Sequence, residues 1–330
     1  MTKHIDIHAH FLHRDCLEDN FGKKFAPAIV RNEKGEEELV QEGRSFGPIA
    51  RKFYDIETRI KNMDAEGIDI QVLSPSPGMI YYNLDAEDCL KLSRLQNDGI
   101  ARIVKEYPHR FKGMATVPLQ APGLALNEMD RAINKLGLSG VAILSTVNQW
   151  QLDAPGLLEF YKEVGGLGVP VFIHPWEFSR EARLRKYHLA NLVGHPFETA
   201  LAEAQLIFSG ILEKYPKLKF CLSHAGGNLP YIRGRLDHGY KVRPECKAVI
   251  NKPPSYYLKN FYCDTITHFG PALEYLVDAV GADNVVLGTD YPYDMADTQA
   301  VSRINKLEGV TEKDKEKILG GNAARLFSIR

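Results

Sequence analysis

The chain has 330 residues, of which 44% are apolar, and its 41 basic residues nearly balance its 42 acidic residues. This length and apolar content suit either one large domain or two medium-sized domains. The balanced charge argues against a nucleic-acid-binding or membrane-surface protein, in which a basic face is expected.

Short apolar runs rich in β-branched and aromatic residues recur along the chain and predict eight strands. These runs span residues 4–10, 68–76, 111–118, 140–147, 169–175, 219–225, 261–265 and 284–290. Helical patterns follow most of them, as at 85–107 and 125–137. Because strands that alternate with helices pair in parallel, we predict an α/β fold, a single (β/α)8 TIM-like barrel over residues 1–330. The alternative, a doubly wound open sheet, would need a glycine-rich turn after the first strand, where His-Ala-His-Phe-Leu stands instead.

Two stretches break the alternation of strands and helices. Residues 11–55, which include the charged run NEKGEEEL, are too long for an ordinary loop. They predict a small insertion after the first strand, with a β-hairpin that covers the barrel mouth. Residues 178–195 are expected to form a second excursion over the same end of the barrel.

The opening residues MTKHIDIHAH contain no long apolar segment, and no window reaches the roughly 18 apolar residues of a membrane span. The five cysteines are scattered and form no C-x-x-C pair, so neither a disulfide framework nor a zinc ribbon is indicated. We therefore expect a cytoplasmic protein that acts neither on nucleic acid nor at a membrane.

Polar side chains close the predicted strands, always at the carboxyl end. In a barrel these ends open on one face, where active sites lie. The residues concerned are His8, His10, His174, His224, Asp264 and Asp290.

The run IDIHAH at 5–10 has a period-two pattern. Because side chains alternate along a strand, His8 and His10 are predicted to point into the barrel, with Ile5, Ile7 and Phe11 facing the helices. An H-x-H pair on a strand can offer two nitrogens to one ion.

Three imidazoles and one carboxylate suggest a site for one divalent metal, with His8, His10, His174 and Asp290 as the ligands. Zn²⁺ is the expected ion, with Mn²⁺ and Fe²⁺ as alternatives. Such an ion lowers the pKa of a bound water from about 15.7 towards about 7. His224 is left over as a catalytic group that orients or moves a proton.

Each of these residues also has an ordinary structural interpretation. His174 alone could be a hydrogen-bonded core histidine, Asp290 an Asx turn or a helix N-cap, and His224 a turn cap. Their joint placement at one rim favours a site, because clustered ionisable groups are costly unless a metal or a substrate compensates them.

Four motifs carry a resemblance to a known family: HAH at 8–10, HPW at 174–176, SHAGG at 223–227 and GTDYP at 288–292. In this order they resemble the amidohydrolase superfamily. RIKNMDAEGIDIQVLS at 59–74 and YPKLKFCLSHAGG at 215–227 are similar to its amidohydrolase-2 branch, in particular to the 2-amino-3-carboxymuconate-6-semialdehyde decarboxylases.

The resemblance implies metal ligands at His8, His10, His174 and Asp290, with a catalytic role for His224. In a decarboxylase, Asp290 is expected to be catalytic as well, as an alternative relay for the proton that reaches the substrate. No counterpart of the carbamylated lysine of the superfamily stands in AILSTV at 142–147, which implies one metal ion. Arg235 falls on an arginine that reaches the neighbouring site, which implies a homodimer.

The departures from that family concern the substrate. A basic pair that binds carboxylates is replaced by Gln41 and Gly47, and a gating tryptophan by Asn191. Gln and Gly cannot make a bidentate carboxylate contact. Arg51 is the expected substitute.

Further substrate contacts are expected from Phe46, Phe178 and Tyr293, besides Asn191, Arg51 and Arg235. The resemblance implies a metal-dependent decarboxylase, a carbon–carbon lyase that acts on a small carboxylated aromatic or unsaturated ring-cleavage acid. The alternative is a hydrolase or hydratase of the same superfamily that uses a metal-bound hydroxide, and a third interpretation is a non-catalytic metal-containing barrel.

Overall fold

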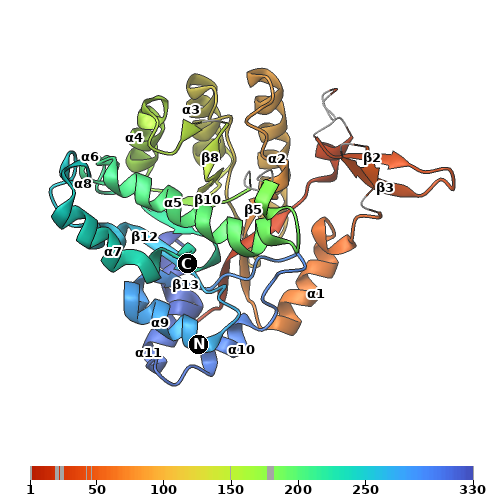
Figure 1. Ribbon diagram of the computed structural model, residues 1–330. Helices are drawn as coiled ribbons and strands as arrows, with labels where there is room; N and C mark the ends of the chain where they lie inside the picture. The colour runs from red at the N-terminus through yellow and green to blue at the C-terminus, as the bar shows by residue number, and fades with distance from the viewer. Residues whose placement is uncertain are drawn as a thin grey trace.

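The computed structural model describes residues 2–18, 22, 26–41, 43–45, 47–148, 150–176 and 182–329. Eight parallel strands form its centre (Figure 1): β1 (Ile5–Phe11), β5 (Ile70–Pro75), β6 (Phe111–Gly113), β7 (Val141–Leu144), β10 (Val171–His174), β11 (Phe220–Leu222), β12 (Phe261–Asp264) and β13 (Val285–Val286).

The eight strands close into a barrel. One set pairs in the order β1-β5-β6 and another in the order β13-β12-β11-β10-β7. Parallel bridges join the two sets, one between Ala115 and Val141 and one between Ala9 and Tyr291. The predicted (β/α)8 barrel is therefore confirmed, and each predicted apolar run contains one of its strands.

Helices surround the strands (Figure 1). They are α1 (Ile56–Glu66), α2 (Ala86–Glu106), α3 (Pro122–Asp130), α4 (Leu158–Leu167), α5 (His195–Phe208), α6 (Ile211–Lys214), α7 (Leu229–Val242), α8 (Pro244–Lys247), α9 (Gly270–Val280), α10 (Ala300–Asn305), α11 (Glu312–Glu316) and α12 (Asn322–Leu326). No helix in the described ranges combines the length and the hydrophobicity that crossing a membrane requires.

A β-bulge in β1 changes which of its residues face the interior. Ile5 pairs with Ile70 and Asp6 with Gln71, but Ala9 pairs with Leu73, so two residues of β1 lie opposite Val72. Such a bulge interrupts the alternation of side chains. The prediction that Ile5 and Ile7 face the helices is therefore wrong.

Ile5 and Ile7 instead belong to a core cluster with Val72, Phe172 and Val286. These residues come from strands around the whole barrel, so the cluster fills the interior. Ala323, Leu326 and Phe327, at the C-terminal helix α12, join the same cluster. Phe11, by contrast, packs with Met63 of α1 and Ile100 of α2, as predicted.

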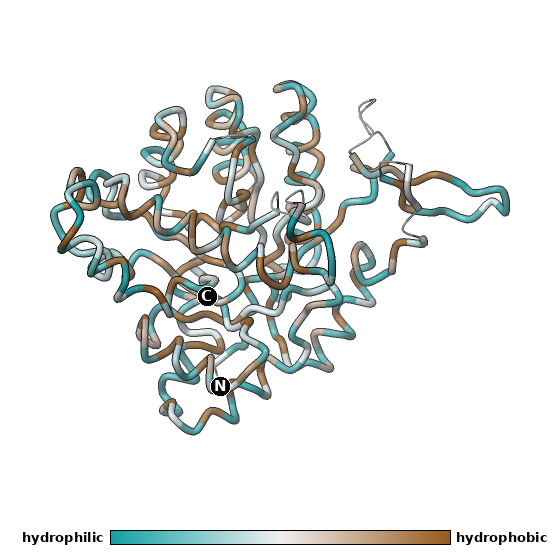
Figure 2. Tube along the Cα trace, viewed as in Figure 1, coloured by the Kyte–Doolittle hydropathy of each residue, from teal (hydrophilic) through white to brown (hydrophobic). Residues whose placement is uncertain are grey.

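The insertion after β1 forms a small antiparallel sheet of β2 (Ala28–Arg31), β3 (Glu37–Gln41) and β4 (Arg44–Ser45). Figure 1 shows this sheet projecting to one side of the barrel, and Figure 2 shows that the tip of its β2–β3 hairpin is hydrophilic. A second hairpin, β8 (Thr146–Val147) and β9 (Trp150–Gln151), follows β7. In the excursion after β10, residues 182–194 lead into α5 through a π-helical turn at Ala190–Gly194.

Candidate metal centre

Four side chains converge at the carboxyl end of the barrel. His8 and His10 come from β1, His174 ends β10, and Asp290 follows β13. All four are buried, and one ligand atom from each lies within 4.8 Å of the others. The structure thus brings together the four residues predicted as ligands.

Hydrogen bonds fix the tautomer of all three histidines. Nδ1 of His174 lies 2.7 Å from the carbonyl oxygen of Pro175, which can only accept, so Nδ1 carries the proton. Nδ1 of His8 lies 2.6 Å from a carboxylate oxygen of Asp264. Nδ1 of His10 lies 2.9 Å from the hydroxyl of Ser74, and that hydroxyl donates to the Ala9 carbonyl. In the neutral form of each ring the Nε2 lone pair is therefore the free one, as metal-binding histidines require.

Asp264 holds both His8 and the turn that carries His224. One of its oxygens accepts from Nδ1 of His8 and from the backbone N–H of His224, at 2.6 and 2.9 Å. The other accepts from the backbone N–H groups of Ala225 and Ile266, at 2.8 and 3.0 Å. These bonds stabilise an unfavourable backbone, because His224 and Ala225 have φ values of 53° and 59°.

A second network of hydrogen bonds, around Asp6 and Arg59, supports strand β1. Asp6 accepts from the backbone N–H and hydroxyl of Thr289, from the side chain of Gln71 and from the backbone N–H of His8. The buried guanidinium of Arg59 donates to Gln71 and to the carbonyl of His10. Desolvation raises the pKa of Asp6 to about 6, although its hydrogen bonds oppose this.

The charges of the cluster suit a cation. Burial lowers the pKa of His10 to about 4 and that of His174 well below its usual range. For His8, burial is outweighed by Asp290 and Asp264, which raise the pKa to about 10. The pKa of Asp290 lies well below its usual range, because the three neighbouring imidazoles outweigh burial.

Two atoms of the cluster also lack a hydrogen-bond partner. Nε2 of His174 is buried without one, and Oδ1 of Asp290, also buried without one, lies 3.3 and 3.2 Å from Nε2 of His8 and of His10. Unpaired buried polar atoms are rare and call for a binding partner. Three imidazole nitrogens and one carboxylate with no thiolate fit one divalent ion such as Zn²⁺ or Mn²⁺.

His224 stands beside the cluster but outside it. Its Nε2 lies 3.8 Å from Oδ2 of Asp290, and its Nδ1 is buried without a hydrogen-bond partner. The ring of His195 stacks on it, with centroids 5.8 Å apart and planes 22° apart. His224 is thus placed to exchange a proton with Asp290 or with a bound molecule.

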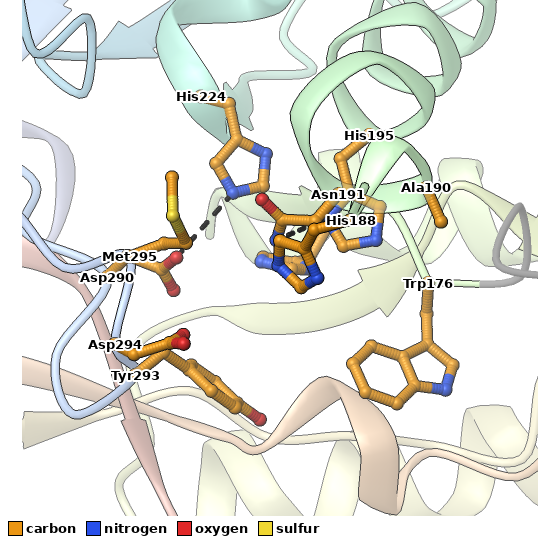
Figure 3. Close-up of a pocket in the computed structure, with 11 residues that line it drawn as sticks. Trp176, His188, Ala190, Asn191, His195, His224, Asp290, Tyr293, Asp294 and Met295 are labelled. Atoms are coloured by element: carbon orange, nitrogen blue, oxygen red, sulfur yellow. Dashed lines mark hydrogen bonds and ion pairs between the residues drawn. The ribbon is translucent and has the colours of Figure 1, made fainter. Parts of the chain in front are cut away.

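A pocket of about 310 Å³ opens above these residues. Figure 3 shows His188, Asn191, His195 and His224 gathered on one side of it, with Asp290, Tyr293 and Trp176 around the remainder. The predicted substrate contacts Asn191 and Tyr293 therefore line the pocket.

The other predicted substrate contacts are placed differently. Arg51 is exposed, pairs with Asp55 at 3.1 Å and lies outside the pocket. Arg235 is exposed on α7. Phe46 and Phe178 lie outside the described residues. A role for these four residues stays a prediction.

Sequence reasoning missed His195 and Trp176 as pocket residues. His195 begins α5 and lies 3.4 Å, Nδ1 to Nδ2, from Asn191. Burial, and then the neighbouring His224, lower its pKa to about 4, so the ring is neutral. Trp176 stands two residues after His174, in the HPW motif, which was the one available signal.

Comparisons with known proteins agree with this geometry. Residues 5–329 match a family model described as Amidohydrolase. The chain is 36% identical over 328 residues to a 2-amino-3-carboxymuconate-6-semialdehyde decarboxylase of Dictyostelium discoideum, covering 98% of this chain and 91% of that protein.

Two solved structures are also similar. The 5-carboxyvanillate decarboxylase of Sphingomonas paucimobilis has a TM-score of 0.86 and 27% identity, with 100% of both chains covered. A dihydroxybenzoic acid decarboxylase from Polaromonas, solved with manganese and 2-nitroresorcinol, has a TM-score of 0.82 and 27% identity, covering 100% of this chain and 98% of that one.

Proposed function

The chain belongs to the amidohydrolase family, and we propose that it is a metal-dependent non-oxidative decarboxylase of a carboxylated aromatic or unsaturated acid. The observation that carries this proposal is the convergence of His8, His10, His174 and Asp290 beside an uncoordinated His224. The relatives with this family match are named decarboxylases of such acids.

One divalent ion, held by these four residues, would act as a Lewis acid at the substrate's carboxylate or a neighbouring oxygen. Zn²⁺ is the ion we propose, on the donor set of three imidazoles and one carboxylate, with Mn²⁺ as the competitor. Elemental analysis of the purified chain, before and after His174→Ala, tests the site. About one ion per chain that survives the substitution would contradict it.

The protein's own residues would supply the proton. The carbon–carbon bond to the carboxylate breaks, its electron pair stays on the ring carbon, and a proton replaces the departing CO₂. His224 and Asp290 are the groups placed to deliver that proton, since Nε2 of His224 and Oδ2 of Asp290 both line the pocket.

Release of CO₂ tests the reaction. Metal-loaded protein is expected to release one CO₂ per molecule of product from members of a panel of hydroxybenzoates and carboxymuconate-like acids. His224→Ala is expected to lower kcat by about 10²–10⁴-fold, the usual contribution of a general acid. Incorporation of ¹⁸O from water into the organic product, without CO₂, would indicate the hydrolase or hydratase alternative.

A homodimer is the second part of the proposal. It is supported by exposed apolar side chains on the side of α7 and α9, where Tyr231 is 82% and Tyr275 is 44% exposed and their rings lie 6.4 Å apart. Arg235 lies exposed on the same helix α7. Sedimentation gives the oligomeric state, and mixing Arg235→Ala with His224→Ala chains should restore part of the activity if sites are shared.

The proposed location is the cytoplasm. All five cysteines are free thiols, as a reducing compartment favours. Cell fractionation tests this, and recovery of the protein from an extracellular or periplasmic fraction would contradict it.

A further inference from the structure

A second pocket, the insertion pocket, lies between the barrel mouth and the inserted sheet. Its volume is about 380 Å³. Its apolar lining includes Leu12, Leu17, Leu39, Ile49, Phe53 and Met79. We propose that this pocket binds an uncharged apolar substituent on the ring of the substrate. The inference rests on the proposed decarboxylase function and adds the chemical class of its substrate.

The insertion pocket adjoins the pocket of the candidate metal centre. Trp176 and Tyr293 line both pockets. The ring of Tyr293 packs edge-to-face against the rings of His10 and Phe53, with ring centroids 5.4 and 5.3 Å apart. Tyr293 therefore stands between a predicted metal ligand and the wall of the insertion pocket, within the reach of one substituted ring.

The two shared aromatic side chains are held in place. The hydroxyl of Tyr293 lies 2.5 Å from that of Ser76. Trp176 packs against Gly78, where an added Cβ would come within 2.8 Å of the indole ring. In Figure 3, Trp176 and Tyr293 lie on the same side of the metal-centre pocket, opposite His224. Side chains that are already held in place favour binding, because little ordering is needed.

The lining of the insertion pocket cannot compensate a charge. Among its described residues, the polar side-chain groups are the hydroxyls of Ser76 and Tyr293, which bond to each other, the indole N–H of Trp176, and the amide of Gln41, which has its own contacts. None of these groups is cationic. A carboxylate buried there would lose its hydration without gaining a cationic partner from the described lining. A methylene group buried there gains about fourfold in binding. The composition therefore selects alkyl over anionic substituents.

A substrate series tests the inference on the metal-loaded full chain. We would compare 2-hydroxybenzoate with its methyl, ethyl and propyl derivatives, and with carboxymethyl derivatives, at each free ring position. At one position kcat/KM should rise about fourfold per methylene, whereas the carboxymethyl compound should fall below the parent acid. If kcat/KM did not change with alkyl length at any ring position, or if a carboxymethyl compound were the best substrate, the inference would be overturned.

Two matched variants localise the effect. Leu39 on β3 lines the insertion pocket, and its neighbour Val40 on the opposite face of the same strand does not. Leu39→Lys should abolish the alkyl preference and improve the carboxymethyl compound, while Val40→Lys should leave both unchanged. Equal effects of the two variants would contradict the assignment of the pocket.

Binding separates this inference from the proposed function. Titration calorimetry with phenols that carry the same alkyl groups needs no turnover, and their affinities should show the same fourfold steps. If no acid releases CO₂ but the affinities of the phenols rise fourfold per methylene, the proposed decarboxylase function is wrong and the inference about the insertion pocket is supported. If CO₂ is released but neither series responds to the alkyl group, only the pocket inference fails.

Discussion

Asp264→Asn is the substitution that most directly tests how the candidate metal centre is supported. Each carboxylate oxygen of Asp264 accepts two hydrogen bonds, one pair from His8 and His224 and the other from Ala225 and Ile266. An asparagine has one acceptor oxygen, and its NH₂ would face two donors in either orientation. The substitution is nearly isosteric, so its effect reports on the lost hydrogen bonds and the lost charge beside His8 rather than on packing.

The expected loss follows from these four bonds. Two hydrogen bonds to a charged acceptor are lost, at about 1.5–3 kcal/mol each, which gives about 3–6 kcal/mol. For a chain of 330 residues, with an unfolding entropy of about 2.1 cal/mol/K per residue, the melting temperature should fall by about 4–9 °C. Because Asp264 also fixes the tautomer of His8, metal affinity should fall by about 10–100-fold.

Thermal unfolding and competition titrations with a metal-binding dye measure both quantities. Asp283→Asn is the matched control, since Asp283 is 65% exposed and pairs with Lys317 at the surface. This control should change stability by less than about 0.5 kcal/mol. If Asp264→Asn matched the control in both assays, Asp264 would not support the centre as described.

Three further substitutions are expected to have defined effects. Burial raises the pKa of Glu203 well above its usual value, so the folded state keeps a proton that the unfolded chain loses above about pH 4.5. The wild type should therefore lose stability relative to Glu203→Gln as the pH rises above about 5, by up to about 1.4 kcal/mol per pH unit, measured by denaturant unfolding at each pH. Equal pH dependence of the two proteins would show that Glu203 ionises in the fold. Gly288→Ala would place a Cβ 2.9 Å from that of His8 and 2.7 Å from that of Asp264. This crowding should lower the free energy of unfolding by about 1–3 kcal/mol and lower the metal content in elemental analysis. A variant with the full metal content and unchanged stability would refute this. Arg59→Met removes the guanidinium that donates hydrogen bonds to the His10 carbonyl and to the Gln71 side chain. It should lower the free energy of unfolding by about 3–5 kcal/mol. A change below about 1 kcal/mol would mean that water replaces the guanidinium.

The barrel could be predicted from the sequence because its strands are short and mostly buried, and because several of the apolar runs close in a polar residue. His174 and Asp290 are more than a hundred residues apart, yet both follow apolar runs, and parallel topology alone brings such ends together. The side of the strand on which Ile5 and Ile7 lie could not be predicted. It depends on the β-bulge, which forms through pairing with β5, and the sequence of β1 does not reveal that partner.

The hydrogen bonds that support the candidate metal centre could not be predicted from the sequence either. Asp264 was recognised as a polar residue that closes a strand, but its contacts with His8 and the backbone of His224 cross 256 and 40 residues of chain. His195 gave no sequence signal, since a histidine at the start of a helix is ordinary. The apolar character of the insertion pocket depends on side chains from four separate segments, Leu12, Leu39, Met79 and Trp176.

The bulge in β1 has a consequence for how the spacing of the two histidines should be understood. The pairings on either side of it, Asp6 with Gln71 and Ala9 with Leu73, would remain available to a strand one residue shorter. His8 and His10 would keep their inward facing in such a strand, so the extra residue is not required by the ligands. What it adds is Ile7, a fully buried apolar side chain in the core cluster of the barrel interior. The length of this strand is therefore set by the volume that the barrel interior has to fill, and a relative with a smaller interior could lose one residue here and keep its metal site.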